Sequence, residues 1–157
     1  MLLDSLILQT KLFFQEDMDM EITDVKRDED NLSSIKLKDY SSMIGTGGTL
    51  NIMILISYEN KILDKLVELY MDGEEVDPDE AEEIRDSVSG ETINTIIGLA
   101  LPTFPGRGKG VTITPPITIN DAAHIKKYKD SKIVTANVFT KYGQLSLSAV
   151  GPADIIK

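Results

Sequence analysis

A long helical pattern occupies residues 76–102 (VDPDEAEEIRDSVSGETINTIIGLALP) and limits the folds open to this chain. Asp77 is a candidate N-cap, Pro78 suits the first helical position, and Glu80 follows the cap by three residues, as in a capping box. Pro102 ends the pattern. One half of this helix is apolar or small, and it consists of Ala81, Val88, Thr92, Ile93, Ile96, Ile97, Leu99 and Ala100. A stripe of this width must pack on a sheet.

The other half of the same helix is polar or small at its centre. At about 100° per residue, Glu91 and Asn94 lie roughly 60° apart on one face, and Ser87 and Gly98 fall within about the same arc. Asn is a poor helix former, so helix propensity alone does not account for Asn94. We predict that Glu91 and Asn94 are exposed and that three residues on the opposite side are buried, namely Val88, Ile96 and Ala100. The simplest alternative is that the polar pair occupies ordinary solvated positions.

The remaining segments are mostly extended, with two further helices. Alternation and β-branched residues predict strands at residues 20–27, 33–45, 49–58, 109–116, 131–142 and 143–151. Residues 4–15 and 59–71 have helical spacing, with Asp4 as a candidate N-cap of the first and Gly73 ending the second. The GTGG segment at 45–48 is predicted as a turn or bulge between two strands.

These elements predict one α+β domain over residues 1–157. Its sheet is mostly antiparallel, with about six strands and two or three helices packed on it. The 157 residues suffice for one domain with a real core.

Composition excludes several classes of function. The formal charge is −10, from 16 basic and 26 acidic residues, which argues against a nucleic-acid partner. Cysteine is absent, so disulfides, thiolate metal sites and thiol nucleophiles are excluded. The longest apolar run, residues 52–56, is too short to span a bilayer, and no signal peptide is recognised. We therefore expect a soluble cytoplasmic protein that does not bind a membrane.

Three other segments suggest chemistry only weakly. GRGKG at 106–110 lacks the Ser or Thr and the following helix of a phosphate-binding loop, which favours a surface turn. His124 has no partner at ligand or triad spacing, so a surface or packing role is predicted. The acidic residues 72–83 are interpreted as the solvated start of a helix, because they lack the loop pattern of a calcium site. No metal site of the chain's own is predicted.

The polar helix residues resemble a known signature. Ser87, Glu91 and Asn94, with Pro116 following Asn94 by 22 positions, are similar to the motif of the CheC/CheX-type chemotaxis phosphatases. The order of the predicted elements also resembles that family over nearly the whole chain. No second E-x-x-N on a helix is found, so the single-motif, CheX-like branch fits better.

The resemblance implies a phosphatase that acts on an aspartyl-phosphorylated receiver of a CheY-like response regulator. In that reading Asn94 orients the attacking water and Glu91 pairs with the receiver's lysine. Ser87, Gly98 and Pro116 belong to the motif or contact the partner. No cofactor is expected on this chain, and Mg²⁺ is expected in the partner receiver.

The resemblance also implies a homodimer, because single-site relatives pair into a continuous sheet. Exposed edge strands can pair in this way, and residues 33–40 and 131–151 are the candidate edges. Two other functions are alternatives for this chain. A non-enzymatic receiver-binding module of the flagellar-switch type has no need of a water-orienting amide. A hotdog-type thioesterase would bury its central helix on most sides, which the polar face at Glu91 and Asn94 opposes.

Overall fold

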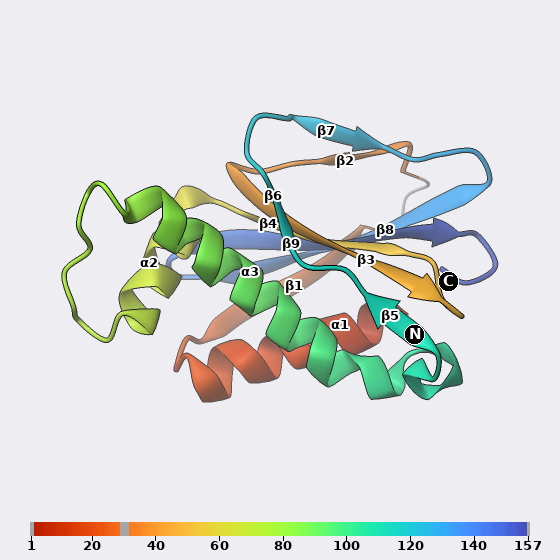
Figure 1. Ribbon diagram of the computed structural model, residues 1–157, viewed down its shortest axis with the longest axis horizontal. Coiled ribbons are helices and arrows are strands. Elements are labelled where there is room, and N and C mark those ends of the chain that lie inside the picture. The colour runs from red at the N-terminus through yellow and green to blue at the C-terminus, as the bar shows by residue number, and fades with distance from the viewer. Residues whose placement is uncertain (1, 29–31, 157) are drawn as a thin grey trace.

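A computed structural model describes residues 2–28 and 32–156, and it shows three α-helices on one face of an antiparallel sheet (Figure 1). The helices are α1 (Leu2–Leu12), α2 (Asn60–Tyr70) and α3 (Ala81–Ala100). The strands are β1 (Ile22–Asp28), β2 (Ser34–Lys36), β3 (Tyr40–Gly48), β4 (Met53–Tyr58), β5 (Val111–Ile113), β6 (Ile117–Ile119), β7 (His124–Lys126), β8 (Ser131–Thr140) and β9 (Gly143–Pro152). The predicted α+β class is confirmed.

The main sheet has the order β1-β8-β9-β4-β3-β5, and β6 pairs with β3 beside β5. All of these pairs are antiparallel. Strands β2 and β7 form a separate two-stranded sheet, which covers the face of the main sheet opposite the helices (Figure 1). The molecule therefore has three layers, with the main sheet in the middle.

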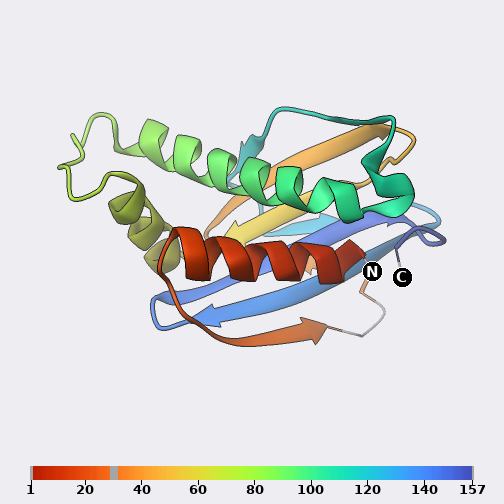
Figure 2. The ribbon, with the colours of Figure 1, turned by 90° about the horizontal axis from the view of Figure 1, so that it is seen from below.

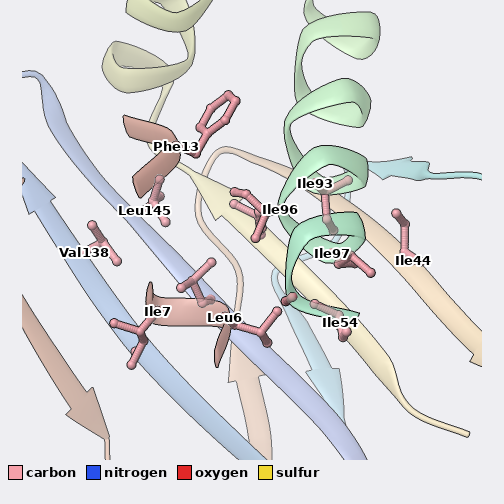
Figure 3. Packing of buried hydrophobic residues seen from close by; sticks show 14 of the residues in the cluster. Leu6, Ile7, Phe13, Ile44, Ile54, Ile93, Ile96, Ile97, Val138 and Leu145 are labelled. Carbon is pink, nitrogen blue, oxygen red and sulfur yellow. The ribbon is translucent and has the colours of Figure 1, made fainter. Parts of the chain in front are cut away.

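Alternation along the central strands supplies two cores, one on each face of the sheet. Ile54 and Ile56 of β4 and Leu147 of β9 face the helices, where α1 and α3 lie side by side across the strands (Figure 2). Residues from both helices and from the sheet meet in this larger core (Figure 3). The smaller core on the other face is formed by Ile35, Leu37, Leu55, Ile133 and Val150. Strand β4 is therefore buried on both faces, with Ile54 and Ile56 in the larger core and Leu55 in the smaller one.

Several predicted boundaries were wrong near β3. Residues 33–45 form two strands, because Ser34–Lys36 pair with β7 in the separate sheet and the chain joins the main sheet only at Tyr40. The Leu37 N–H still donates to the Ala123 carbonyl beside β7. The GTGG segment is the end of β3, where Thr46, Gly47 and Gly48 pair with β5. Gly48 has φ +77°, and a Cβ there would collide with the Gly110 carbonyl oxygen, so this pairing requires glycine.

The predicted starts of two helices were also wrong. Helix α3 begins at Ala81, and Asp77 instead caps a turn by accepting from the Asp79 N–H at 3.0 Å. Helix α1 begins by Leu2, so Asp4 lies in its first turn, where it forms an ion pair with Arg27. Strands β6 and β7 were not predicted as separate strands.

Candidate functional site on helix α3

Helix α3 is held on the sheet by one face and leaves the other open. Its buried residues include Val88, Ile93, Ile96, Ile97 and Ala100, which pack on the strands and on α1. A buried hydrogen bond of 2.8 Å from Ser42 Oγ of β3 to Ser89 Oγ holds α3 in position against the sheet. The predicted burial of Val88, Ile96 and Ala100 is confirmed.

The opposite face carries the predicted site residues. Ser87, Glu91, Asn94 and Gly98 are all exposed, as the helical period requires. Leu99 was predicted on the packing half, but 49% of it is exposed. It lies at the border of the stripe, next to the exposed Gly98, so this assignment was wrong.

An open depression of about 540 Å³ lies between this face of α3 and strand β6. Its lining consists of Asp86, Ser87, Gly90, Glu91, Asn94, Pro116 and Thr118. Four of the five predicted motif residues therefore meet in one place, although Pro116 comes from a different element. Gly98 does not line the depression, and it lies one turn beyond Asn94.

Pro116 forms one wall of the depression by packing on Gly90. A Cβ at Gly90 would lie 3.3 Å from the Pro116 Cγ, which is tighter than ordinary contact. Glycine inside a helix costs about 1 kcal/mol relative to alanine. The close approach of Pro116 is the physical reason why a glycine occupies position 90. The unfavourable glycine within the helical sequence SVSGETIN (residues 87–94) was visible, but Gly90 was not predicted as a site residue.

The segment that carries Pro116 is tied at both ends. Before it, the Gly45 N–H donates to Thr114 Oγ1 at 2.9 Å, and the Thr114 N–H donates to the Gly45 carbonyl at 2.9 Å. After it, Asn120 Nδ2 donates to the Glu82 carboxylate at 3.4 Å. The wall opposite α3 is thus fixed to the sheet and to the start of the helix. Thr118, also in the lining, follows on β6.

The two central side chains have little engagement with the rest of the molecule. In the described part of the chain, Glu91 Oε1 accepts a single, long hydrogen bond of 3.5 Å from Thr95 Oγ1. Within residues 2–28 and 32–156, the Asn94 carboxamide makes no hydrogen bond to the protein. The Asn94 amide and the weakly held Glu91 carboxylate are both exposed and line the depression, so they are available to a ligand or partner.

Tyr70, at the end of α2, lies close enough to Glu91 for their electrostatic interaction to matter. Partial burial raises the pKa of the Tyr70 phenol, a hydrogen bond with Thr92 Oγ1 lowers it, and the Glu91 charge raises it. The Tyr70 hydroxyl and Thr92 Oγ1 are 3.3 Å apart. Tyr70 therefore stays neutral beside Glu91 at ordinary pH.

The weaker sequence candidates lie away from this depression. His124 is exposed on β7, and GRGKG falls in a 3-10 helix and turn, as predicted. In the described part of the chain no group of three His, Asp or Glu residues is placed to hold a metal ion. No helix among the described residues is long and apolar enough to cross a membrane.

Comparison with known proteins identifies the same family as the motif. The family model described as chemotaxis phosphatase CheX matches residues 40–138. A putative chemotaxis protein from Desulfovibrio vulgaris Hildenborough is similar in structure, with a TM-score of 0.77, 18% identity and 96% of each chain covered. No curated protein sequence matches the chain.

Two further solved structures share the fold. The chemotaxis protein CheX from Desulfovibrio desulfuricans has a TM-score of 0.76 and 16% identity, over 94% of this chain and 97% of that one. The CheX–CheY–BeF3–Mg²⁺ complex from Borrelia burgdorferi has a TM-score of 0.72 and 19% identity, over 96% of this chain and 97% of that one. At these low sequence identities, the structural similarity establishes the fold alone.

Proposed function

The chain belongs to the CheX family of chemotaxis phosphatases, and we propose on that basis that it accelerates hydrolysis of the aspartyl phosphate on a CheY-like response-regulator receiver. The observation that carries the proposal is the exposed pair of Glu91, which has only a long hydrogen bond from Thr95 among the described residues, and Asn94, beside Pro116 in one depression. A helix face of this kind can approach a phosphorylated surface without rearranging its own fold.

Asn94 orients the attacking water in this proposal. Its carboxamide accepts a hydrogen bond from water and donates one, but it does not take up a proton at neutral pH. The water oxygen forms the new bond to phosphorus, and the bond between phosphorus and the receiver's aspartate oxygen breaks. Both hydrogens of the water end on the phosphate product, which leaves as H2PO4⁻, and the aspartate is released as a carboxylate. Positioning of this kind is a large part of catalysis in phosphoryl transfer.

Glu91 holds the receiver in register. It lies one turn before Asn94, and its carboxylate has only the weak Thr95 contact to give up. We propose that it pairs with the lysine that receivers carry beside the phosphate. Mg²⁺ belongs to the receiver in this scheme, where it neutralises phosphate charge, and the Borrelia complex contains CheY together with Mg²⁺.

The experiment that tests the function is phosphate release from a panel of phosphorylated receivers, with and without this protein. Faster release from at least one receiver supports a phosphatase. If a receiver binds in its activated form and release stays at the spontaneous rate, the chain is instead a non-enzymatic receiver-binding module of the flagellar-switch type.

We also propose that the chain forms a homodimer through a sheet edge. The predicted edge at residues 131–151 was wrong, because β8 and β9 are interior strands. Residues 33–40 reach only the small β2–β7 sheet and the start of β3. Among the described strands, β1 ends the main sheet on the side away from the depression, so pairing there leaves the site open. Sedimentation that shows only monomer at about 100-fold above the working concentration removes this proposal.

A further inference from the structure

A second hollow, of about 380 Å³, lies on the other side of the exposed ridge of α3. We call it the α2–α3 notch, and it is lined by Tyr70, Met71, Ile84, Ser87, Val88 and Glu91. Most of this lining is hydrocarbon or aromatic, in contrast to the polar depression beside Pro116. Ser87 and Glu91 line both hollows, so the two share one ridge.

The walls of the notch are fixed by contacts between α2 and α3. The Tyr70 hydroxyl lies 3.3 Å from Thr92 Oγ1, which itself donates to the Val88 carbonyl at 2.8 Å. Below the notch, Arg85 of α3 donates to Asn60 of α2 at 2.7 Å and forms an ion pair with Asp64. A hollow that is already formed loses little conformational entropy when a partner fills it.

The surroundings of the notch are strongly acidic. Residues 72–86 connect its two walls, and they include nine acidic side chains and one basic one. The nine are all exposed, and they are Asp72, Glu74, Glu75, Asp77, Asp79, Glu80, Glu82, Glu83 and Asp86. Within the described residues none of them forms a salt bridge, because the single arginine is engaged with Asp64. The loop projects at one end of the molecule (Figures 1 and 2).

We propose that the α2–α3 notch accepts an apolar side chain of the receiver, on a segment whose neighbouring residues are Lys or Arg. The inference rests on the proposed function, and it names the chemistry of the partner surface. A receiver whose lysine reaches Glu91 must also cover the notch, because Glu91 forms the ridge between the two hollows. The acidic loop attracts the basic residues around that apolar side chain.

The notch contributes to binding and to the choice of receiver, and it takes no part in the chemistry. Asn94 lines only the other hollow. Loss of the apolar walls should therefore weaken the complex without slowing hydrolysis inside it. This separates the notch from Asn94, whose loss slows hydrolysis inside the complex.

The test uses the paired substitution Met71→Gln/Ile84→Gln, which keeps side-chain size but removes the apolar match. Binding of a beryllofluoride-activated receiver and steady-state phosphate release are both measured. We expect the dissociation constant and KM to rise about tenfold, with kcat at saturating receiver within about twofold of wild type. An unchanged kcat also shows that the variant is folded, and a melting curve supports this.

The matched control is Leu8→Gln, because Leu8 is 52% exposed on α1 and lines neither hollow. It should leave both constants unchanged. A second arm, Glu74→Gln/Glu75→Gln, should slow association at low salt and have little effect at high salt.

The outcomes separate this inference from the proposed function. If wild type speeds phosphate release and the Met71→Gln/Ile84→Gln variant has the KM of wild type, the notch proposal is wrong and the function stands. If wild type binds an activated receiver without speeding release, the function is wrong, and the dissociation constant of the variant still decides the notch. A wild-type chain that binds no receiver of the panel overturns both.

Discussion

The two faces of helix α3 are under different constraints. On the sheet side, Ile93 and Ile97 have no exposed surface and fill the larger core. On the open side, Asn94 makes no hydrogen bond within the described residues, and a Cβ at Gly98 would meet nothing within 4 Å. Packing therefore explains the residues of one face and leaves those of the other unexplained. Residues that folding does not require are the ones on which a functional proposal can rest.

The largest effect on stability should come from the buried face. Ile97→Ala removes buried methyl and methylene groups and leaves a cavity, so the free energy of unfolding should fall by about 2–5 kcal/mol. Denaturant unfolding measures this, and phosphate release per folded molecule should not change. Leu99→Ala on the border of the stripe is the control and should cost far less. A loss below about 1 kcal/mol for Ile97→Ala would contradict the assignment of this face to the core.

On the open face, substitution of Asn94 should reduce activity and leave stability nearly unchanged. Asn94→Ala should lower kcat by roughly 100-fold or more, because an amide that orients water acts in the transition state. Stability should change by no more than about 0.5 kcal/mol, as for other exposed sites, and receiver binding should be nearly intact. Single-turnover phosphate release measures the rate.

The matched control for Asn94 is Asn51→Ala. Asn51 is exposed just before β4 and does not line the depression. It should keep most of the activity. If Asn94→Ala releases phosphate as fast as wild type, the water-orienting mechanism is wrong and the binding-module reading becomes the better one.

Glu91 should affect binding as well as turnover. Glu91→Ala removes a charged contact with the receiver that exists before the transition state, so KM should rise while kcat also falls. Glu91→Gln keeps the shape and isolates the contribution of charge. Titration of the phosphorylated receiver measures both constants. The control is Asp154→Asn, an exposed carboxylate that lines neither hollow. A variant with altered kcat and unchanged KM would show that Glu91 does not hold the receiver.

The helix period and strand alternation were enough to predict an antiparallel sheet with helices packed on it, and the exposed side of α3. They did not predict the third layer formed by β2 and β7. They failed where three-residue strands depend on distant partners. Strand β2 exists because Ile35 pairs with Ile125 of β7, and β6 exists because it pairs with β3. Three residues are too few to show alternation. The chain direction at Leu37 is set by a hydrogen bond from 86 residues away in sequence, to Ala123.

The candidate site was predicted only in part, because some of its residues come together only through contacts between distant segments of the chain. Ser87, Glu91 and Asn94 share one helix, so spacing alone groups them, whereas Pro116 was added only by resemblance to a family. Gly90 was detectable as a glycine in a helix interior. The apolar notch was not detectable, because Met71 and Ile84 meet only once α2 has packed against α3.

The smallest effect should come from one methyl group added at two glycines of the same helix. Gly98→Ala meets open space, so the better helix propensity of alanine should raise the free energy of unfolding by about 0.5–1 kcal/mol. At Gly90 the same gain is opposed by Pro116, whose Cγ lies 3.3 Å from the new Cβ. Gly90→Ala should therefore be less stable than Gly98→Ala, and it should lower kcat because it displaces the wall of the depression.

Gly98 nevertheless lies one turn beyond Asn94, on the side that a receiver must approach. If the receiver contacts Gly98, the added methyl of Gly98→Ala should weaken receiver binding by about 0.6 kcal/mol, which raises the dissociation constant roughly threefold. A variant that is more stable than wild type and binds receiver less tightly is the expected result, measured by denaturant unfolding and by receiver titration. A variant that gains stability and binds as tightly as wild type would limit the contact surface to the part of α3 before Gly98. In that case Gly98 has no role in receiver binding. Of the residues on the open face, only Ser87, Glu91 and Asn94 would then remain as candidates for contact with the receiver.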